Sequence, residues 1–295
     1  MRLFLSIALI VSCGYTFGQT RAELDSLKIL LEKVSVDDQK FRLGWDSIIL
    51  KYGINSPEFI ELVQKMNRQD SINMSIVGGI IDKYGWLSAE QISTEANSTL
   101  FMVIQHAPVE FQLKYLPVMK KAVDEKKAKA SDYALLVDRT NMFQGKLQIY
   151  GSQFNYDAKG NIHIYPIFDE PQLNERRNSV GLPSMEDYCK MVSQFTGQNL
   201  IYILPKTDRY KDKIVIKGSV TTKGTNEPIA NVSISIGNNN LVGSTDSSGF
   251  FEIVLDKKLV TGKVIFRKKG YQTTHQRLKG KGRDVYDFNA VLVKK

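Results

Sequence analysis

The chain has 295 residues, with 40 Lys and Arg against 31 Asp and Glu, and a formal net charge of +9. The charge is uneven: residues 214–295 hold 14 basic and 6 acidic residues, a net +8, whereas residues 19–213 hold 25 of each. The excess therefore does not indicate nucleic-acid binding, and we expect no nucleic-acid partner. The only cysteines, Cys13 and Cys189, exclude a disulfide-rich scaffold and a thiolate zinc site.

Residues 1–18 predict a secretory signal peptide. One arginine precedes an apolar run from Leu3 to Val11, which is too short to span a bilayer. Small residues before Gln19 favour cleavage after residue 18, whereas IVSCG (10–14) also fits a loose lipobox that would place a diacylglycerol on Cys13. We expect export to the periplasm or the outside, or lipid anchoring to the outer membrane through Cys13. No other segment reaches the ~20 apolar residues of a transmembrane span.

The next part of the chain predicts helices. Apolar residues at helical spacing indicate one helix in RAELDSLKILLEKV (21–34) and a longer one from its N-cap Ser56 to Gly85. The pair Gly78 and Gly79 would weaken the longer helix in its middle. Further helices are predicted at about 95–106, from Pro108 to the charged run DEKKAKA (124–130), and over 131–145, with a serine as the N-cap of the last.

After residue 145 the spacing of apolar residues changes. KLQIYGSQF (146–154) and NIHIYPI (161–167) alternate around a turn and predict a β-hairpin, and two short helices follow at about 171–180 and 185–195. From residue 214, seven short alternating runs separated by turns predict a seven-stranded antiparallel β-sandwich. The expected fold is multidomain α+β: a signal peptide (1–18), a mainly helical domain with a hairpin (19–195), a linker (196–213) and the sandwich (214–295).

The first candidate site lies in STLFMVIQHAPVEFQ (98–112). This run is apolar most of the way around a helix, so Gln105 and His106 at its end should be buried and need partners. They can satisfy free carbonyl groups where one helix ends and the next begins, or His106 can act as a general base in a cleft. Because His163 and His275 lie far away in sequence, we predict no metal site.

The second candidate site contains a carboxylate and arginines. In ALLVDRTNMFQG (134–145), Asp138 falls on the inward face of its helix, where it needs a cation or several donors. The candidate partners are His106, Arg139, Arg176 and Arg177. An Asp–His pair would orient the imidazole in either a catalytic or a structural role. The adjacent arginines can instead bind a ligand carboxylate or phosphate, or pair with an aspartate of the chain.

The sequence lacks the motifs of several common types of catalytic and cofactor site. The strand-like stretch LQIYGSQF (147–154) offers hydrogen-bonding groups on Tyr150, Ser152 and Gln153. However, the sequence contains no Gly-x-Ser-x-Gly elbow, glycine-rich phosphate loop or zinc-helix motif. We therefore do not expect Ser152 to be a nucleophile, and we predict no cofactor.

These landmarks resemble a widespread bacterial domain of unknown function. KYGW, QHAPVEFQLKYLPVMKKAV, SDYALLVDRTNMFQGKLQIYGSQF, PIFDEP and ERRNSVGLP follow the order of that family's motifs over about residues 75–190. The family's polar positions fall on Gln105, His106, Asp138, Arg139, Gln148, Tyr150, Gly151, Gln153, Asp169, Arg176 and Arg177. Pro108 stands where the family has an acid, and Ser152 where it has threonine, so a role that needs a carboxylate next to His106 is in doubt.

The C-terminal stretch resembles the carboxypeptidase regulatory-like domain, a transthyretin-like sandwich. IKGSVTTKGTNEPIANVSISIGNNNLVGSTDSSGFFEIVL followed by VIFRKKGYQTT carries this resemblance, and Asp246 is expected to accept backbone N–H groups in a turn. The resemblance implies an exported accessory module that connects, stabilises, or binds glycan or protein. Its basic groups can bind an anionic glycan, a lipid or an envelope protein, or only keep the sandwich soluble. These groups are Lys257-Lys258, Arg267-Lys268-Lys269 and Lys279-Lys281-Arg283.

Two functions are compatible with these observations. The first is an exported binding or scaffolding protein of the cell envelope, whose helical domain holds an anionic group or peptide near His106, Arg139 and Arg176. The second is a hydrolase in which His106 is the general base, Asp138 orients it and the arginines offset substrate charge.

Overall fold

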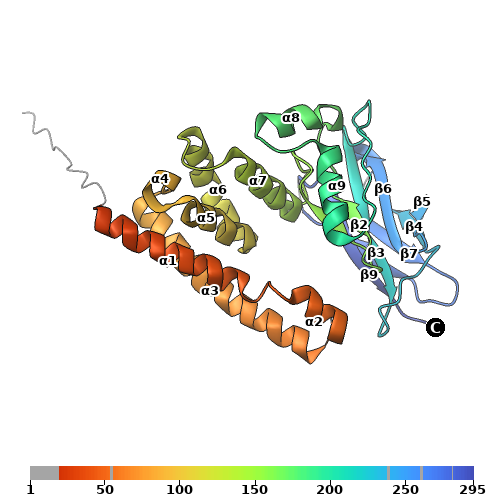
Figure 1. Ribbon diagram of the computed structural model, residues 1–295. Helices are drawn as coiled ribbons and strands as arrows, with labels where there is room; N and C mark the ends of the chain where they lie inside the picture. Colours follow the sequence, from red (N-terminus) through yellow and green to blue (C-terminus); the bar gives the residue numbers. More distant parts are fainter. Residues whose placement is uncertain (1–19, 54–55, 238–239, 260–261, 281) are drawn as a thin grey trace, which may run out of the picture.

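The computed structural model describes residues 20–53, 56–237, 240–259, 262–280 and 282–295. The predicted signal peptide and Cys13 lie outside these residues. Among the described helices, none combines the length and the apolar character that crossing a membrane requires. An α-helical part is followed by a β-rich part, as Figure 1 shows. The predicted α+β class is confirmed.

The helical part forms because its segments carry apolar stripes, and side-chain caps begin several of them. Its elements are α1 (Arg21–Gln39), α2 (Trp45–Tyr52), α3 (Pro57–Tyr84), α4 (Ala89–Ile92), α5 (Thr94–His106), α6 (Val109–Asp124) and α7 (Ala130–Gln144). The Ser56 side chain accepts the backbone N–H of Phe59 at 3.1 Å and caps α3 as predicted. The predicted serine cap of the helix at 131–145 is not observed: α7 begins at Ala130, after Lys129, and no side chain caps it. The elements α2 and α4 were not predicted.

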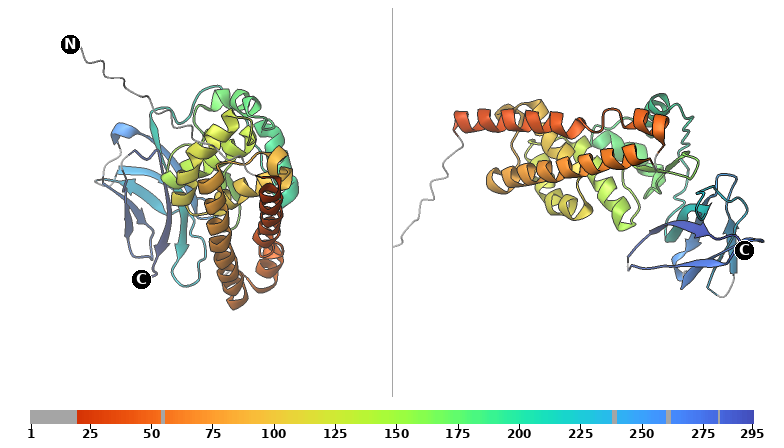
Figure 2. Two further views of the ribbon diagram at one scale, coloured as in Figure 1. Left: turned by 90° about the vertical axis from the view of Figure 1, so that its left-hand side faces the viewer. Right: turned by 90° about the horizontal axis from the view of Figure 1, so that it is seen from below.

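The long helix α3 is continuous through its two glycines. A Cβ atom at position 78 would lie 2.9 Å from the Tyr115 hydroxyl oxygen, so Gly78 allows α6 to approach α3 closely. The expected weakening is therefore compensated by packing. In Figures 1 and 2, α1 and α3 run side by side and the shorter helices cover them. The core between them includes Leu31, Val34, Val77, Leu100, Ile104, Tyr115, Met119 and Leu136.

A small α/β region connects the two parts. It contains the hairpin β1 (Phe154–Tyr156) and β2 (Ile162–Ile164), the 3₁₀ turn η1 (Glu170–Gln172), α8 (Leu173–Ser179) and α9 (Met185–Thr196). The hairpin is shorter than predicted, because residues 147–153 form a loop rather than a strand. Ile167, Leu173, Met185 and Cys189 form the core of this region. Residues 197–212 then lead to the first strand of the sandwich, and we call them the connector.

The β-rich part contains two sheets. Its strands are β3 (Lys213–Thr222), β4 (Ser233–Ile236), β5 (Asn240–Ser244), β6 (Phe250–Asp256), β7 (Lys263–Arg267), β8 (Thr274–Arg277) and β9 (Val285–Leu292), and the 3₁₀ turn η2 (Lys257–Leu259) follows β6. The sheet orders are β6-β3-β9 and β5-β4-β7-β8. Neighbouring strands are antiparallel except β3 and β9, which pair in parallel. Asp246 accepts the backbone N–H groups of Ser248 and Phe250 at 2.8 and 3.0 Å, as its turn predicts.

The two parts share a packed interface. Leu147, Tyr165, Tyr210, Val215 and Val285 form one buried apolar cluster between the small α/β region and the sheet β6-β3-β9, and Met142 of α7 packs against it. The carbonyl of residue 145 accepts backbone N–H groups of residues 284 and 285, both at 2.8 Å. In Figure 2 the sandwich accordingly lies beside the hairpin, away from the start of α1.

Candidate functional site

Most polar residues that the family resemblance marks converge on one loop, residues 147–153. Asp138 on α7 is fully buried, and its carboxylate accepts the backbone N–H groups of Ile149, Tyr150 and Ser152 at 2.6, 2.9 and 2.9 Å. Burial raises the pKa of the Asp138 carboxyl group, and the three N–H donors oppose that shift. Several donors, rather than a cation, therefore satisfy this carboxylate.

Gln148 closes the same loop from within. Its side-chain oxygen accepts the Gln153 backbone N–H at 2.8 Å, and its Nε2 donates to the carbonyls of Gln153 and Tyr165 at 3.1 and 2.6 Å. The Gln153 side chain donates to Ser152 Oγ at 3.0 Å. Gly151 has a φ of +68°, and a Cβ there would lie 3.0 Å from Ile167 Cδ1, so the position requires glycine.

The two adjacent arginines of α8 hold the carbonyl side of the loop. Arg176 Nε donates to the Ile149 carbonyl at 3.0 Å, and Nη1 donates to the Asp169 carbonyl at 2.9 Å and lies 3.4 Å from its carboxylate. Arg177 donates to the Tyr150 carbonyl at 2.5 Å and to the Pro183 carbonyl at 2.6 Å. Burial lowers the pKa of both guanidinium groups. Both arginines thus bind backbone of the chain itself.

His106 lies beside Asp38, not beside Asp138. Its Nδ1 is 3.0 and 3.3 Å from the two oxygens of Asp38, a residue that is 1% exposed. Arg42 Nη1 lies 3.4 Å from the same carboxylate. The expected Asp138–His106 pair does not form, because the Asp138 oxygens face the loop. The sequence did contain a signal for Asp38: it continues the buried stripe of Leu31 and Val34 on α1 by one turn.

Arg139 is the marked arginine that lacks a charged partner. Its Nη1 donates to the Gln105 carbonyl at 3.3 Å, but its buried Nε has no hydrogen-bond partner in the described part of the chain. No ion pair with a described carboxylate involves it. Burial lowers the pKa of Arg139, and Tyr188 is the only group that opposes this shift.

Two amide oxygens near Arg139 are also unpaired. Gln112 Nε2 donates to the carbonyls of Gln105 and Ala107 at 3.2 and 2.8 Å. The side-chain oxygens of Gln105 and Gln112 are buried without a partner among the described residues. An orphaned donor and two orphaned acceptors thus come from residues that meet at the Gln105 carbonyl. Buried polar groups of this kind are rare and require an explanation, such as an ordered water or a bound ligand.

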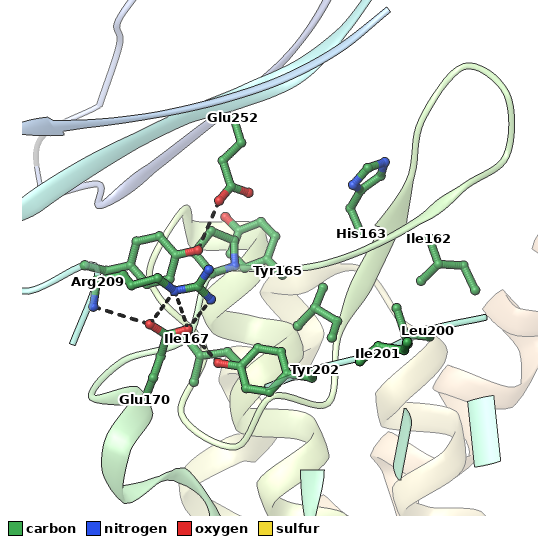
Figure 3. A pocket seen from close by; sticks show the side chains of 13 residues that line it. Ile162, His163, Tyr165, Ile167, Glu170, Leu200, Ile201, Tyr202, Arg209 and Glu252 are labelled. Atoms are coloured by element: carbon green, nitrogen blue, oxygen red, sulfur yellow. Dashed lines mark hydrogen bonds and ion pairs between the residues drawn. The ribbon is translucent and has the colours of Figure 1, made fainter. Parts of the chain in front are cut away.

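A cavity of about 220 Å³ lies elsewhere, between the hairpin, the connector and β6 (Figure 3). Glu170 is fully buried there and accepts hydrogen bonds from Arg209 Nε at 2.9 and 3.1 Å and from the Tyr202 hydroxyl at 2.5 Å. The Tyr210 hydroxyl donates to Glu252 at 3.0 Å. None of these residues was a predicted site residue, because 39 positions separate Glu170 from Arg209 and no motif links them.

Two lysines of the predicted basic groups in the sandwich have partners within the chain. Lys257 lies 2.8 Å from Asp284, and Lys268 donates to the Ala230 carbonyl at 3.0 Å, whereas Lys281 lies outside the described residues. Over the residues that the structure describes, no cluster of three or more His, Cys, Asp and Glu side chains is arranged to hold a metal ion.

The fold and these sites define a helical domain that carries an accessory β-sandwich. The chain belongs to the family of unknown function DUF6624, whose model matches residues 25–200, and a CarboxypepD_reg-like domain matches residues 216–295. Both predicted resemblances are confirmed. No curated protein matches the chain. Among solved structures, a 9R-lipoxygenase from Cyanothece PCC8801 matches 42% of this chain at 16% identity with a TM-score of 0.19, and this chain covers 22% of that one. A TM-score this low supports no conclusion about fold or function.

Proposed function

We propose that the protein is an exported binding protein of the bacterial cell envelope, whose helical domain binds a carboxylate or phosphate group at Arg139. One observation carries this proposal: Arg139 is largely buried, and its Nε has no partner in the described chain. Removing a charge from water without a partner costs several kcal/mol. An anionic ligand would supply the missing charge and accept the free N–H groups of the guanidinium.

The surroundings of Arg139 support this proposal. The neighbouring carboxylate of Asp138 is saturated by the loop, so it is not available to Arg139. The unpaired oxygens of Gln105 and Gln112 can accept hydroxyl or amide protons of the same ligand. The ligand would therefore carry an anionic group next to a hydrogen-bond donor, as a hydroxy acid or a peptide C-terminus does.

Export and the role of the sandwich belong to the same proposal. The signal-peptide pattern of residues 1–18 supports export, with either cleavage before Gln19 or lipidation of Cys13. The sandwich, joined through residues 196–213, would connect the binding domain to another envelope component. Mass spectrometry of the mature N-terminus distinguishes the two forms of processing, and an unprocessed Met1 would contradict export.

Isothermal titration of the purified protein with lactate, a dipeptide and inorganic phosphate tests the anion site. We expect Arg139→Gln to weaken binding at least tenfold, because charge-assisted hydrogen bonds contribute about 1.5–3 kcal/mol. Arg21→Gln is the matched control, since Arg21 is exposed and, within the described chain, pairs with Asp25 at 3.2 Å. Absence of binding by all three probes, or equal binding by the Arg139→Gln variant, would contradict the proposal.

A hydrolase is the second candidate, and the Asp38–His106 contact favours it. Because Nδ1 faces the buried Asp38 carboxylate, Nε2 is the nitrogen left to accept a proton. In this version Asp38 takes the orienting role that the sequence assigned to Asp138. Ester and phosphoester substrates test it: a catalytic base predicts that His106→Gln loses turnover with a near-normal melting temperature. A structural histidine predicts a melting temperature lowered by several degrees and no activity in either protein.

A further inference from the structure

The cavity in Figure 3 is built from both parts of the chain. Residues 162–167 of the hairpin form one wall, the connector supplies Ile201, Tyr202 and Arg209, and β6 supplies Glu252. A molecule in this cavity would touch the small α/β region, the connector and the sandwich at the same time. Neither part alone provides the site.

Charged groups in the cavity wall are balanced in pairs. Glu170 is bound by Arg209, and Glu252 lies 3.8 Å from Nζ of the fully buried Lys217. His163 Nε2 is 3.1 Å from Asp157. An ionic ligand would lose its hydration here without gaining a free countercharge. The wall therefore favours an uncharged ligand, in contrast to the unpaired cation at Arg139.

The remaining surface offers aromatic rings next to hydrogen-bond acceptors. Tyr202 is a partly exposed ring in the cavity wall, whereas Tyr165 and Tyr210 lie behind the wall at 2% and 5% exposure; the hydroxyl groups of Tyr202 and Tyr210 are held by Glu170 and Glu252. Each carboxylate has about four acceptor sites, so Glu252 can accept further hydroxyl protons. One accessible ring, that of Tyr202, beside a few fixed acceptors suits a small molecule that is apolar on one face and rich in hydroxyl groups at its edge.

We infer that this cavity binds one uncharged sugar ring. Its volume of about 220 Å³ lies below the ~300–1,000 Å³ of typical drug-sized pockets, which favours a small ligand such as a single ring. A longer glycan would place only its terminal or one exposed unit inside. Because the ligand would contact the hairpin, the connector and β6 together, binding would also stabilise the interface between the two parts.

Two exposed isoleucines of the connector give a matched test. Ile201 lines the cavity and is 68% exposed, whereas Ile203 is 83% exposed and is not among the lining residues. Tryptophan at position 201 would cover the mouth of the cavity, while tryptophan at position 203 would add the same surface outside it. Both variants should fold with the melting temperature of the unmodified protein, because both side chains already face solvent.

Saturation-transfer NMR and isothermal titration of the full chain with methyl α-glucoside and N-acetylglucosamine measure the binding. We expect Ile203→Trp to bind like the unmodified protein and Ile201→Trp to bind at least tenfold more weakly. Arg139→Gln should retain sugar binding, so failure of the anion site does not affect this result. Absence of binding by both sugars, or equal binding by the two tryptophan variants, would overturn the inference. If inorganic phosphate binds and only Ile201→Trp abolishes that binding, the cavity takes an anion, and the inference of an uncharged sugar is also overturned.

Discussion

Replacing Asp138 tests whether the polar residues at the family's positions hold the loop at 147–153 in place. Asp138→Ala would leave three N–H groups without an acceptor: that of Ser152, which is buried, and those of Ile149 and Tyr150, which are partly buried. Each unsatisfied buried donor costs about 1–3 kcal/mol, which gives roughly 3–9 kcal/mol if the costs add. Because the three donors belong to one loop that can relax, we expect about 3–5 kcal/mol. A typical domain has only about 5–15 kcal/mol of stability, so this variant should be close to unfolding.

Asp138→Asn gives a graded version of the same perturbation. The N–H groups of Ile149 and Tyr150 both point to Oδ1, which asparagine retains, whereas the N–H of Ser152 points to Oδ2, which becomes an NH₂ group. One lost acceptor predicts a loss of about 1–3 kcal/mol. Urea denaturation followed by circular dichroism measures both variants, with the exposed pair member Asp25→Asn as a control that should stay within about 0.5 kcal/mol. Equal losses for asparagine and alanine, or an alanine variant within about 1 kcal/mol of the unmodified protein, would refute the reasoning.

Two further predictions concern the interface and its acid sensitivity. Gly145→Ala should destabilise the protein more than Gly197→Ala. Both glycines end helices with φ near +70°. A Cβ at position 145 would lie 2.6 Å from a carbonyl oxygen of β9, whereas a Cβ at position 197 would have no atom within 4 Å among the described residues. Differential scanning calorimetry should show the larger drop for position 145, and equal drops would contradict this. Burial opposes ionisation of Asp157, but hydrogen bonds from Asn161 and His163 hold its pKa below the ordinary value. Its folded-state pKa is thus depressed, so its stabilising contribution is present above about pH 4 and disappears as the pH falls further. The Asp157→Asn variant should have a lower free energy of unfolding than the unmodified protein at pH 7. Urea titrations below pH 4 should show this difference in free energy becoming smaller. A difference that does not change with pH would contradict a depressed pKa of Asp157.

Helices and strands were predictable where the pattern is long and locally capped. The segment from Ser56 to Gly85 has a cap, a proline at N1, a long apolar stripe and a terminal glycine, and α3 has these ends. The elements α2 and α4, of 8 and 4 residues, are too short for periodicity to stand out. The parallel pairing of β3 with β9 was not predictable either, because alternation indicates a strand but not its neighbour.

The sequence allowed us to predict which residues belong to the candidate site, but not which groups each of them contacts. Alternation in residues 146–154 suggested a strand, yet Asp138 and the two α8 arginines satisfy that backbone in place of a ladder. Side chains from distant segments thus override the local pattern, and no spacing rule reveals this. The same limit explains why Asp38, rather than Asp138, is beside His106: sequence spacing identifies an inward-facing carboxylate but not which of two such carboxylates an imidazole meets.

The difference between Arg139 and the α8 arginines separates architecture from a candidate binding site. Arg176 and Arg177 direct their N–H groups at carbonyls of the loop whose N–H groups Asp138 accepts, so positive and negative charges flank one backbone segment. Burial lowers the pKa of both arginines, and nearby groups oppose this shift, led by Asp169 for Arg176 and by Tyr188 for Arg177, with Asp138 a further contributor to each. For Arg139, Tyr188 is the one described group that opposes the lowering of the pKa by burial, and Asp138, although adjacent in sequence, does not contribute. Arg176 and Arg177 direct N–H groups at backbone carbonyls, whereas the Nε of Arg139 is buried without a partner among the described residues, and the proposed anion would accept this N–H.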